Sequence, residues 1–340
     1  MALRVLHLVG SAVNDFSADL SRLYARDCLE SIHDPGRYEP SVAYVSPDGG
    51  WRFPTDLSDA AIEAAPAMSV GAAIDRIGAL SIDVMVPQMF CLPGMTHYRG
   101  LFDVLQIPYV GNTPDVMALT AHKARAKAVV AAAGVRVPRG EVLGPGMRPS
   151  LEPPVVVKPV NSDNSLGVGL VREPAELDAA LEAAWTHSDE ALVESFVELG
   201  REVRCGIVVR GDDLVCLPLE EYAVDPTTKP IRGFDDKISR DGGGDLNLVA
   251  KDVSRAWIVD SGDPLTQVVW DAARACHLAL GCRDYSLFDF RIDPEGRAWF
   301  LEAGLYCSFA RQSVIPMMAR AAGIPLDELF HTALLQRMAA

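Results

Sequence analysis

Short apolar runs alternate with amphipathic segments through the first third of the chain. Residues 4–9 and 41–45 are apolar runs typical of buried strands, and the segment from Asp19 to Ser31 has the spacing of an amphipathic helix. The segments from Asp83 to Pro87 and from Tyr109 to Gly111 are further strand candidates. Alternating strands and helices predict a parallel sheet in this part of the chain.

The pattern changes after residue 120. Residues 120–133, rich in alanine and lysine, predict a helix that stops at Gly134, so we expect a domain boundary near residues 115–140. From Pro153 we expect a strand from Val155 to Lys158, a glycine-containing loop at 161–167 and a second strand from Val168 to Val171. A helix from Pro174 to Trp185 follows, and then two strands, from Leu192 to Phe196 and from Glu202 to Val209.

The segment from Tyr222 to Lys251 carries many Asp, Gly, Pro and Lys residues and has little periodicity. A long irregular stretch in a compact chain is usually a functional lid or a disordered insertion, and we interpret this one as a lid. After it we expect a helix over 264–280, strands over 285–292 and 297–302, and a last helical region over 313–338.

Composition narrows the class of protein. A chain of 340 residues predicts two or three lobes, and 49% apolar with 23% charged residues is typical of a globular protein. No apolar stretch reaches the ~18 to 20 residues of a membrane helix. The seven cysteines form no CxxC pair and suit a reducing compartment, so we expect a cytoplasmic protein with free thiols. A net charge of -15 makes nucleic acid an unfavourable partner, although a nucleotide can still bind at a local basic site.

Asp289 and Glu302 are the first candidates for chemistry. They lie on the two arms of a predicted hairpin whose turn is Asp293-Pro294-Glu295-Gly296, so their carboxylates can lie side by side. Adjacent carboxylates need a cation, and Mg²⁺ favours carboxylate oxygens together with phosphate oxygens and water. On spacing alone, two surface acids on a hairpin are an equally good interpretation.

Lys158 ends a run of valines that predicts a buried strand, where a lysine is costly unless an anion meets it. The loop that follows, Asn161 to Val168, is rich in small polar residues that can offer donors to phosphate. It does not match GxxxxGK[ST], so a P-loop is excluded. The alternative is a strand-end lysine whose ammonium reaches solvent.

Lys123 and Lys127 are spaced one helical turn apart, which on its own favours a solvated helix face. Glu194 and Glu202 lie at predicted strand ends, where glutamate is common. These residues gain significance only in combination.

In combination, the order and spacing resemble the ATP-grasp superfamily, and specifically the D-alanine:D-alanine ligase family, over nearly the whole chain. The family's metal and substrate region is resembled by Asp289 to Asp293, Trp299 to Ala303, and Ser313 to Gly323. Its ATP loop is resembled by Val157 to Pro159 and Ser165 to Val168, and its domain junction by Ile107 to Gly111 and His122-Lys123.

The resemblance implies an α/β fold with α+β lobes, arranged as a three-lobed ATP-grasp fold. The expected lobes are an N-terminal parallel-sheet domain over 1–117, a central lobe over 118–211, and a C-terminal lobe over 212–340 with the metal and substrate site. It implies ATP and Mg²⁺ as cofactors and small-molecule carboxylate and amine substrates that resemble amino acids. A homodimer is left open.

The resemblance also implies individual roles. Lys123, Lys158 and Ser165 would hold the phosphates of ATP. Glu194, with the backbone of Phe196 and Val197, would face adenine, and Glu202 would hold the ribose. Asp289 and Glu302 would bind Mg²⁺. Lys237 would approach the transferred phosphate from the lid, and Ser313 would hold the carboxylate of the second substrate.

Several positions depart from the family pattern. Gly304 stands where the family's Glu-x-Asn motif has the amide that coordinates a second Mg²⁺. Leu287 replaces an arginine that in the family helps to stabilise the tetrahedral intermediate, so Arg283 or Arg311 would have to take that role. The N-terminal acidic serine motif is only faintly present as Asn14-Asp15-Phe16-Ser17, and Met89 to Gly100 replaces a glycine-rich stretch. The pocket for the first substrate is therefore rebuilt.

These departures favour an amino-acid ligase of specialised metabolism, which makes a dipeptide or related amide, over a D-alanine:D-alanine ligase of wall synthesis. An ATP-binding protein without ligase turnover is a third hypothesis, against which the retention of Lys158, Asp289 and Glu302 weighs. The sequence names neither the acid, nor the amine, nor their chirality.

Overall fold

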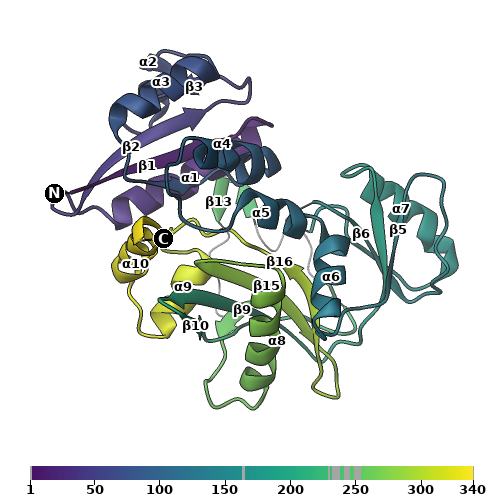
Figure 1. The fold of residues 1–340 in the computed structure, drawn as a ribbon. Helices are drawn as coiled ribbons and strands as arrows, with labels where there is room; N and C mark the ends of the chain where they lie inside the picture. Colours follow the sequence, from purple (N-terminus) through teal and green to yellow (C-terminus); the bar gives the residue numbers. More distant parts are fainter. Residues whose placement is uncertain are drawn as a thin grey trace.

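The computed structural model describes residues 2–162, 165–228, 230–231, 238–240, 246–248 and 254–339. The described residues contain four sheets, and each of the three larger ones is the centre of its own region (Figure 1). The N-terminal sheet lies at the upper left of Figure 1, a small sheet at the right, and the largest sheet at the bottom. The expected α/β fold is confirmed.

The N-terminal sheet has the order β3-β2-β1-β4. β1 (Leu3–Gly10) pairs in parallel with both β2 (Tyr38–Val45) and β4 (Val84–Pro87), and β3 (Trp51–Arg52) adds an antiparallel edge. The parallel sheet is thus confirmed, whereas Tyr109 contributes only a single bridge to Met85.

Helices complete this region. α1 (Asp15–Ser31) begins one turn earlier than expected, because the Asn14 side chain accepts a hydrogen bond from the N–H of Ser17 and caps it there. The remaining helices are α2 (Asp59–Ala64), α3 (Val70–Leu80), the π-helical turn η1 (Gly94–Tyr98) and α4 (Arg99–Val104).

The single helix expected over 120–133 is two helices, α5 (Pro114–Ala121) and α6 (Lys123–Ala132). His122 separates them with extended dihedral angles, and its ring accepts a hydrogen bond from the N–H of Arg125, which caps α6. Apolar residues of both helices join the core of the largest sheet. This packing turns one face of α6 inward.

The small sheet is antiparallel, in the order β5-β8-β6-β7. It contains β5 (Gly140–Leu143), β6 (Val155–Pro159), β7 (Gly169–Val171) and β8 (Ala191–Ser195), and α7 (Leu177–Trp185) follows a 3-10 turn (Pro174–Glu176) to cover it. Val155 and Val157 are buried against Leu181 and Ala184. The buried valine strand that ends at Lys158 is confirmed.

The largest sheet has the order β14-β11-β9-β15-β16, and β10 pairs with β9. Its members are β9 (Arg201–Arg210), β10 (Asp213–Cys216), β11 (Glu220–Tyr222), β14 (Ala256–Ile258), β15 (Tyr285–Ile292) and β16 (Ala298–Ala303). One face, with Val203, Cys205, Phe288 and Phe290, packs into the main core together with residues of α8 (Leu265–Ala279). Because side chains alternate along a strand, the residues between them point to the opposite face.

The C-terminal helical region is divided into α9 (Val314–Ala321) and α10 (Leu326–Ala339) around Gly323, whose φ of 78° ends the first helix. β12 (Ile238–Arg240) and β13 (Leu246–Leu248) form a separate two-stranded sheet. The rest of the expected lid, Lys237 included, lies largely outside the described residues.

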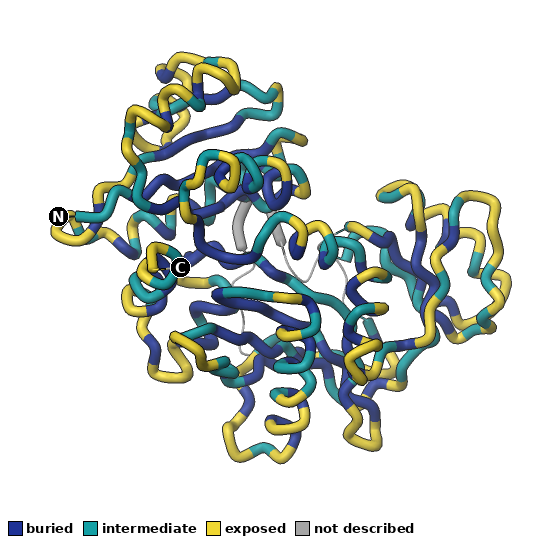
Figure 2. Tube along the Cα trace, in the orientation of Figure 1, coloured by how far each residue is buried: buried dark blue, intermediate teal, exposed yellow. Residues whose placement is uncertain are grey.

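Buried stretches follow the central strands of the sheets, and exposed stretches follow the outer sides of the helices (Figure 2). β9, which was expected in the central lobe, is hydrogen-bonded within the largest sheet. The lobe boundaries at 117 and 211 stay predictions. Within the described residues, no helix combines the length and apolar character needed to cross a membrane.

Candidate active site

An open cavity lies between the small sheet and the largest sheet, and its empty space, counted together with the open solvent at its mouth, is about 790 Å³. Its walls combine α6, both sheets and the loop after β6: Lys123, Pro138, Val156, Lys158, Pro159, Ser162, Ser165, Val168, Glu194, Ser195, Val197, Glu202, Ile231, Asp289, Arg291, Leu301 and Glu302. Most of the side chains that the sequence singled out therefore meet in one place.

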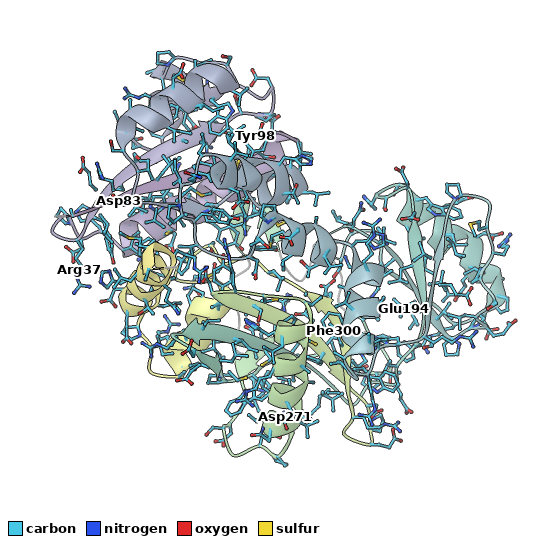
Figure 3. All side chains as sticks on the ribbon, viewed as in Figure 1. Arg37, Asp83, Tyr98, Glu194, Asp271 and Phe300 are labelled. Carbon is cyan, nitrogen blue, oxygen red and sulfur yellow. The ribbon has the colours of Figure 1, made fainter. Side chains whose placement is uncertain are left out.

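One wall of the cavity is a buried ion cluster around Glu194. The Nζ atoms of Lys127 and Lys158 lie 2.7 Å and 2.6 Å from its two carboxylate oxygens, and all three side chains are less than a tenth exposed. Burial opposes ionisation of Glu194, but the charges of Lys127 and Lys158 lower its pKa. Burial lowers the pKa of Lys127 to about 8, against the attraction of Glu194. Figure 3 labels Glu194 and also Phe300, whose carbonyl accepts a hydrogen bond from Lys127.

Lys123 begins α6 beside this cluster. Its backbone N–H donates to the carbonyl of Val160, its ammonium donates to the carbonyl of Ser162, and its Nζ lies 3.6 Å from Glu302 Oε2. Both Lys123 and Lys127 are buried. The solvated helix face favoured by their spacing alone is therefore wrong, because α6 packs this face against β16 and β8.

The loop after β6 contributes Ser165, which lines the cavity with a φ of 59°. Gly167 follows it with a φ of 68°, and a Cβ atom there would come within 2.8 Å of His187. Glycine is required at this position both by its dihedral angle and by the close packing. The loop is thereby held against α7.

A second ion pair crosses β9 and β15. Arg291 NH2 lies 2.6 Å from Glu202 Oε2, and the guanidinium also donates to the carbonyls of Val197 and Pro230. Its carbon lies 5.4 Å from the centre of the Phe196 ring, a cation–π distance. The N–H of Phe196 is already donated to the carbonyl of Pro154. The sequence interpretation missed Arg291, although its place two residues after Asp289 on one strand put it on the same face.

The third ion pair joins Arg204 to Asp289, which are register partners on β9 and β15. Arg204 Nε and NH2 lie 2.7 Å and 3.2 Å from the two carboxylate oxygens. Despite the opposing effect of burial, the charge of Asp289 helps to raise the pKa of Arg204 well above its usual range. Arg204 was also missed; its alternation with Glu202 along the strand was the available signal.

Glu302 lies opposite Asp289 as its register partner on β16. The register shifts between Asp289 and Phe290, and this irregularity carries Glu302 to the cavity face although Phe300 points into the core. No group of three or more His, Cys, Asp or Glu side chains in the described ranges could hold a metal by itself. Two facing carboxylates fit Mg²⁺, which completes its coordination with phosphate oxygens and water.

Apart from Phe196, three predicted residues that the structure describes do not line the cavity. Arg283 donates to the carbonyl of Gly111 and lies over the Tyr109 ring, and Arg311 forms a two-pronged ion pair with Asp27 of α1. Both arginines therefore tie the N-terminal region to the C-terminal one.

Ser313 is the third of these residues and occupies the N-cap position of α9. Its hydroxyl makes no capping hydrogen bond and contacts the hydroxyl of Ser308 instead. The sequence alone favoured a simple N-cap, but the Ser313 side chain does not cap α9. The two positions that depart from the family motif, Leu287 and Gly304, are neighbours, because the N–H of Gly304 donates to the carbonyl of Leu287 over 2.8 Å.

Comparisons with known proteins agree with this geometry. Residues 146–335 match the family model described as D-ala D-ala ligase C-terminus. A D-alanine–D-alanine ligase from Methylorubrum populi is 34% identical over 246 residues, which cover 68% of this chain and 73% of that protein. The ligase of the same name from Citrifermentans bemidjiense is 31% identical over 236 residues, with 68% and 70% covered.

Solved structures share the fold. The D-Ala:D-Ser ligase VanG from Enterococcus faecalis has a TM-score of 0.79 at 21% identity and covers 99% of this chain and 100% of its own. The D-alanine–D-alanine ligase from Coxiella burnetii has a TM-score of 0.75 at 18% identity, with 99% and 94% covered. The chain therefore belongs to the D-alanine–D-alanine ligase family of ATP-grasp enzymes, which form carbon–nitrogen bonds with ATP and Mg²⁺.

Proposed function

We propose that this protein joins the carboxylate of one amino-acid-like substrate to the amine of a second, with D-alanine as the first candidate for both. The observation that carries the proposal is the single cavity that collects Lys158, Glu194, Glu202, Asp289 and Glu302 from two sheets. The family relationship supports the same reaction, since the relatives named above are D-alanine–D-alanine ligases.

The charge distribution in the cavity supports an orientation for ATP. Lys123, Lys158 and the loop at Ser165 would hold the phosphates, and Glu202, with Arg291 behind it, would hold the ribose. Val197 and Glu194 would face the adenine. Asp289 and Glu302 would hold Mg²⁺, which when bound neutralises charge on the phosphates.

The reaction has two displacements. A carboxylate oxygen of the first substrate bonds to the γ-phosphorus of ATP, the bond from that phosphorus to the β–γ bridging oxygen breaks, and ADP leaves. The amine nitrogen of the second substrate then bonds to the acyl carbon, the bond from that carbon to the phosphate oxygen breaks, and inorganic phosphate leaves while the nitrogen loses a proton to solvent. The protein's part is to position the groups and to stabilise charge.

Ser313 and Lys237 complete the proposed set. The hydroxyl of Ser313, together with the N–H groups of Val314 and Ile315 at the start of α9, would hold the carboxylate of the second substrate. Lys237, outside the described residues, would approach the transferred phosphate. Because Arg283 and Arg311 are bound to groups away from the cavity, we propose that they position the N-terminal region over the site.

The comparisons favour the D-alanine ligase alternative over a ligase of specialised metabolism. One observation nevertheless supports a larger first substrate. Tyr24, Phe90 and Tyr306 form a chain of partly exposed rings, with centroids 5.5 Å and 5.3 Å apart, between α1 and the segment after β16. Such rings would favour an apolar side chain on the carboxylate donor.

An amino-acid panel tests the proposal. Purified protein is incubated with ATP, Mg²⁺ and pairs of D- and L-amino acids, and phosphate release and product mass are measured. D-alanyl-D-alanine as the preferred product supports the first candidate, and a dipeptide with an aromatic or apolar first residue supports the second. Phosphate release that no amino acid stimulates, with no amide product, contradicts both and supports an ATP-binding protein without ligase turnover.

A further inference from the structure

Arg204 is a largely covered cation on the same face of the largest sheet as Glu202 and Asp289, although it does not itself line the cavity. Its guanidinium makes two parallel hydrogen bonds to Asp289, of 2.7 Å and 3.2 Å, and the side chains of this pair are 15% and 14% exposed. The guanidinium carbon also lies 5.3 Å from the centre of the Tyr222 ring. A two-pronged pair in such surroundings holds the guanidinium in one orientation.

The position of Arg204 along β9 places it beyond the ribose end of the cavity. Glu202 lines the cavity, Arg204 follows on the same face, and Gly206 comes next. A Cβ atom at Gly206 would lie 3.0 Å from the sulfur of Met318, so α9 closes the face there. Arg204 thus lies between the cavity and α9, whose N-cap residue is Ser313. The proposed function brings the transferred phosphate and the two substrates together in this region.

The charges around Asp289 and Glu302 leave room for one divalent ion. Both oxygens of Asp289 already accept from Arg204, and Glu302 Oε2 lies 3.6 Å from Lys123 Nζ, so each carboxylate has a cation. A carboxylate offers about four lone-pair positions, of which Arg204 takes two at Asp289. The remaining lone pairs of Asp289 and Glu302 can face one ion held between the two carboxylates.

Gly304 supports the same conclusion. A Cβ atom there would meet only Leu287, at the ordinary contact distance of 3.9 Å, and the backbone is not left-handed. A larger residue would therefore fit, yet this position offers no side-chain ligand. At Asp289 the positive charge comes from Arg204, the residue that forms an ion pair with this carboxylate.

We propose that Arg204 is a catalytic residue of this ligase, whose guanidinium stays on Asp289 and supplies, at the transferred phosphate, charge that would otherwise need a second divalent ion. The inference rests on the proposed function for the identity of the reaction. It assigns to Arg204 the stabilising role that the sequence led us to expect from Arg283 or Arg311, both of which bind groups away from the cavity.

Counting metal ions tests the first part without turnover. The wild-type protein is saturated with a non-hydrolysable ATP analogue and titrated with Mn²⁺, and free Mn²⁺ is followed by electron paramagnetic resonance. One bound Mn²⁺ per bound nucleotide supports the proposal, and two overturn it. This count needs no amino-acid substrate, so it stands even if the amino-acid panel fails and the proposed function falls.

Kinetics test the second part once a substrate pair is known. Arg204→Gln should lower kcat by about 100-fold, as loss of a group that stabilises transition-state charge does, with analogue affinity changed less than about threefold. Added methylguanidinium should restore at least a tenth of the lost rate in Arg204→Ala. A kcat for Arg204→Gln within threefold of the wild type overturns the catalytic role.

Arg201→Gln is the matched control, because Arg201 on the same strand makes an equivalent two-pronged pair with Glu221, which, unlike Asp289, does not line the cavity. It should leave kcat and the Mn²⁺ count unchanged. Arg204→Lys keeps the charge and provides a second variant if Arg204→Gln does not fold. An intermediate kcat for Arg204→Lys supports the proposal. If every Arg204 variant loses both its fold and analogue binding, and the wild type binds two ions, Arg204 has a structural role instead.

Discussion

The carboxylate of Glu194 on β8 lies 2.7 Å from the ammonium of Lys127 on α6, and both side chains are almost fully buried. Lys158 approaches the other oxygen of the same carboxylate at 2.6 Å. One anion between two cations leaves a net positive charge beneath the cavity. That charge suits a site for the phosphates of a nucleotide, and it also makes the stability of the protein depend on pH.

The lowered pKa of Lys127 predicts that the protein becomes more stable at alkaline pH. This pKa is about 8 in the folded chain, chiefly because burial disfavours the charged form, and about 10.4 is usual for an unfolded chain. Between these values the unfolded state binds more protons, so the free energy of unfolding increases with pH. From pH 7.5 to pH 9.5 we expect the wild type to gain roughly 2 kcal/mol relative to Lys127→Met, measured by denaturant titration.

Arg125→Met serves as the control for this measurement. Arg125 lies on the exposed side of the same helix, and its removal also deletes one positive charge. Its difference from the wild type should be the same at both pH values. A parallel pH response of wild type and Lys127→Met would contradict the assignment to Lys127.

Asp289 and Glu302 predict equal losses of turnover but unequal losses of stability. Asp289→Asn and Glu302→Gln should each lower kcat by at least about 100-fold, since both carboxylates would hold Mg²⁺. Asp289→Asn removes the counter-charge that accepts two hydrogen bonds from Arg204, a side chain only 15% exposed, so we expect a loss of about 3 kcal/mol there. Glu302 is 35% exposed, and its variant should unfold within about 0.5 kcal/mol of the wild type.

Asp293→Asn is the matched control on the same hairpin. The Asp293 carboxylate accepts hydrogen bonds from Trp299 and Arg297 and does not line the cavity. This variant should lose stability and keep its kcat. Wild-type turnover in Glu302→Gln at ordinary Mg²⁺ concentration would rule out the metal role of Glu302.

Ser313 predicts a change in substrate affinity without a change in stability. Its hydroxyl makes no capping hydrogen bond, so Ser313→Ala should leave the melting temperature nearly unaltered. If the hydroxyl holds the carboxylate of the second substrate, KM for the amine substrate rises by an amount that corresponds to roughly 1.5 to 3 kcal/mol, while ATP affinity stays the same.

Ser58→Ala is the matched control for Ser313. The Ser58 hydroxyl does cap α2, accepting a hydrogen bond of 3.2 Å from the N–H of Ala61. Its loss should cost about 1 kcal/mol and leave KM unchanged. A lower melting temperature with unaltered KM in Ser313→Ala would remove the substrate role.

The segment from Tyr222 to Lys251 is predicted to close over bound nucleotide. An ATP analogue with Mg²⁺ should therefore slow protease cleavage within it, as followed by mass spectrometry. Arg291 donates to the carbonyl of Pro230 over 2.7 Å, so Arg291→Gln should weaken this protection. Arg297→Gln, at the exposed turn of the same hairpin, should retain it. Equal cleavage with and without nucleotide in the wild type would count against a lid.

Local patterns in the sequence were sufficient for most of the elements and for part of the site. The valines before Lys158 predicted a buried strand, and the structure contains β6 (Val155–Pro159) with that lysine buried. The turn at Asp293 to Gly296 predicted the hairpin on which Asp289 and Glu302 face each other. Such features depend on neighbours along the chain, so periodicity and turn residues reveal them.

Breaks between helices were harder to predict, because composition alone does not determine where a helix ends. The alanine-rich segment over 120–133 has good helix formers throughout, yet the chain turns at His122 so that α5 and α6 can both pack on the largest sheet. That break points Lys123 and Lys127 inward. Spacing along one helix cannot reveal such a contact.

The ion pairs of the site were decided only by the tertiary structure. Lys127 with Glu194, Arg204 with Asp289, and Arg291 with Glu202 are each more than sixty residues apart in sequence. The sequence by itself determined which strands carry charges and which face those charges share, since alternation along a strand is local. It did not determine which charges meet, because that depends on strand order and register, and these follow from hydrogen bonding and packing over the whole core.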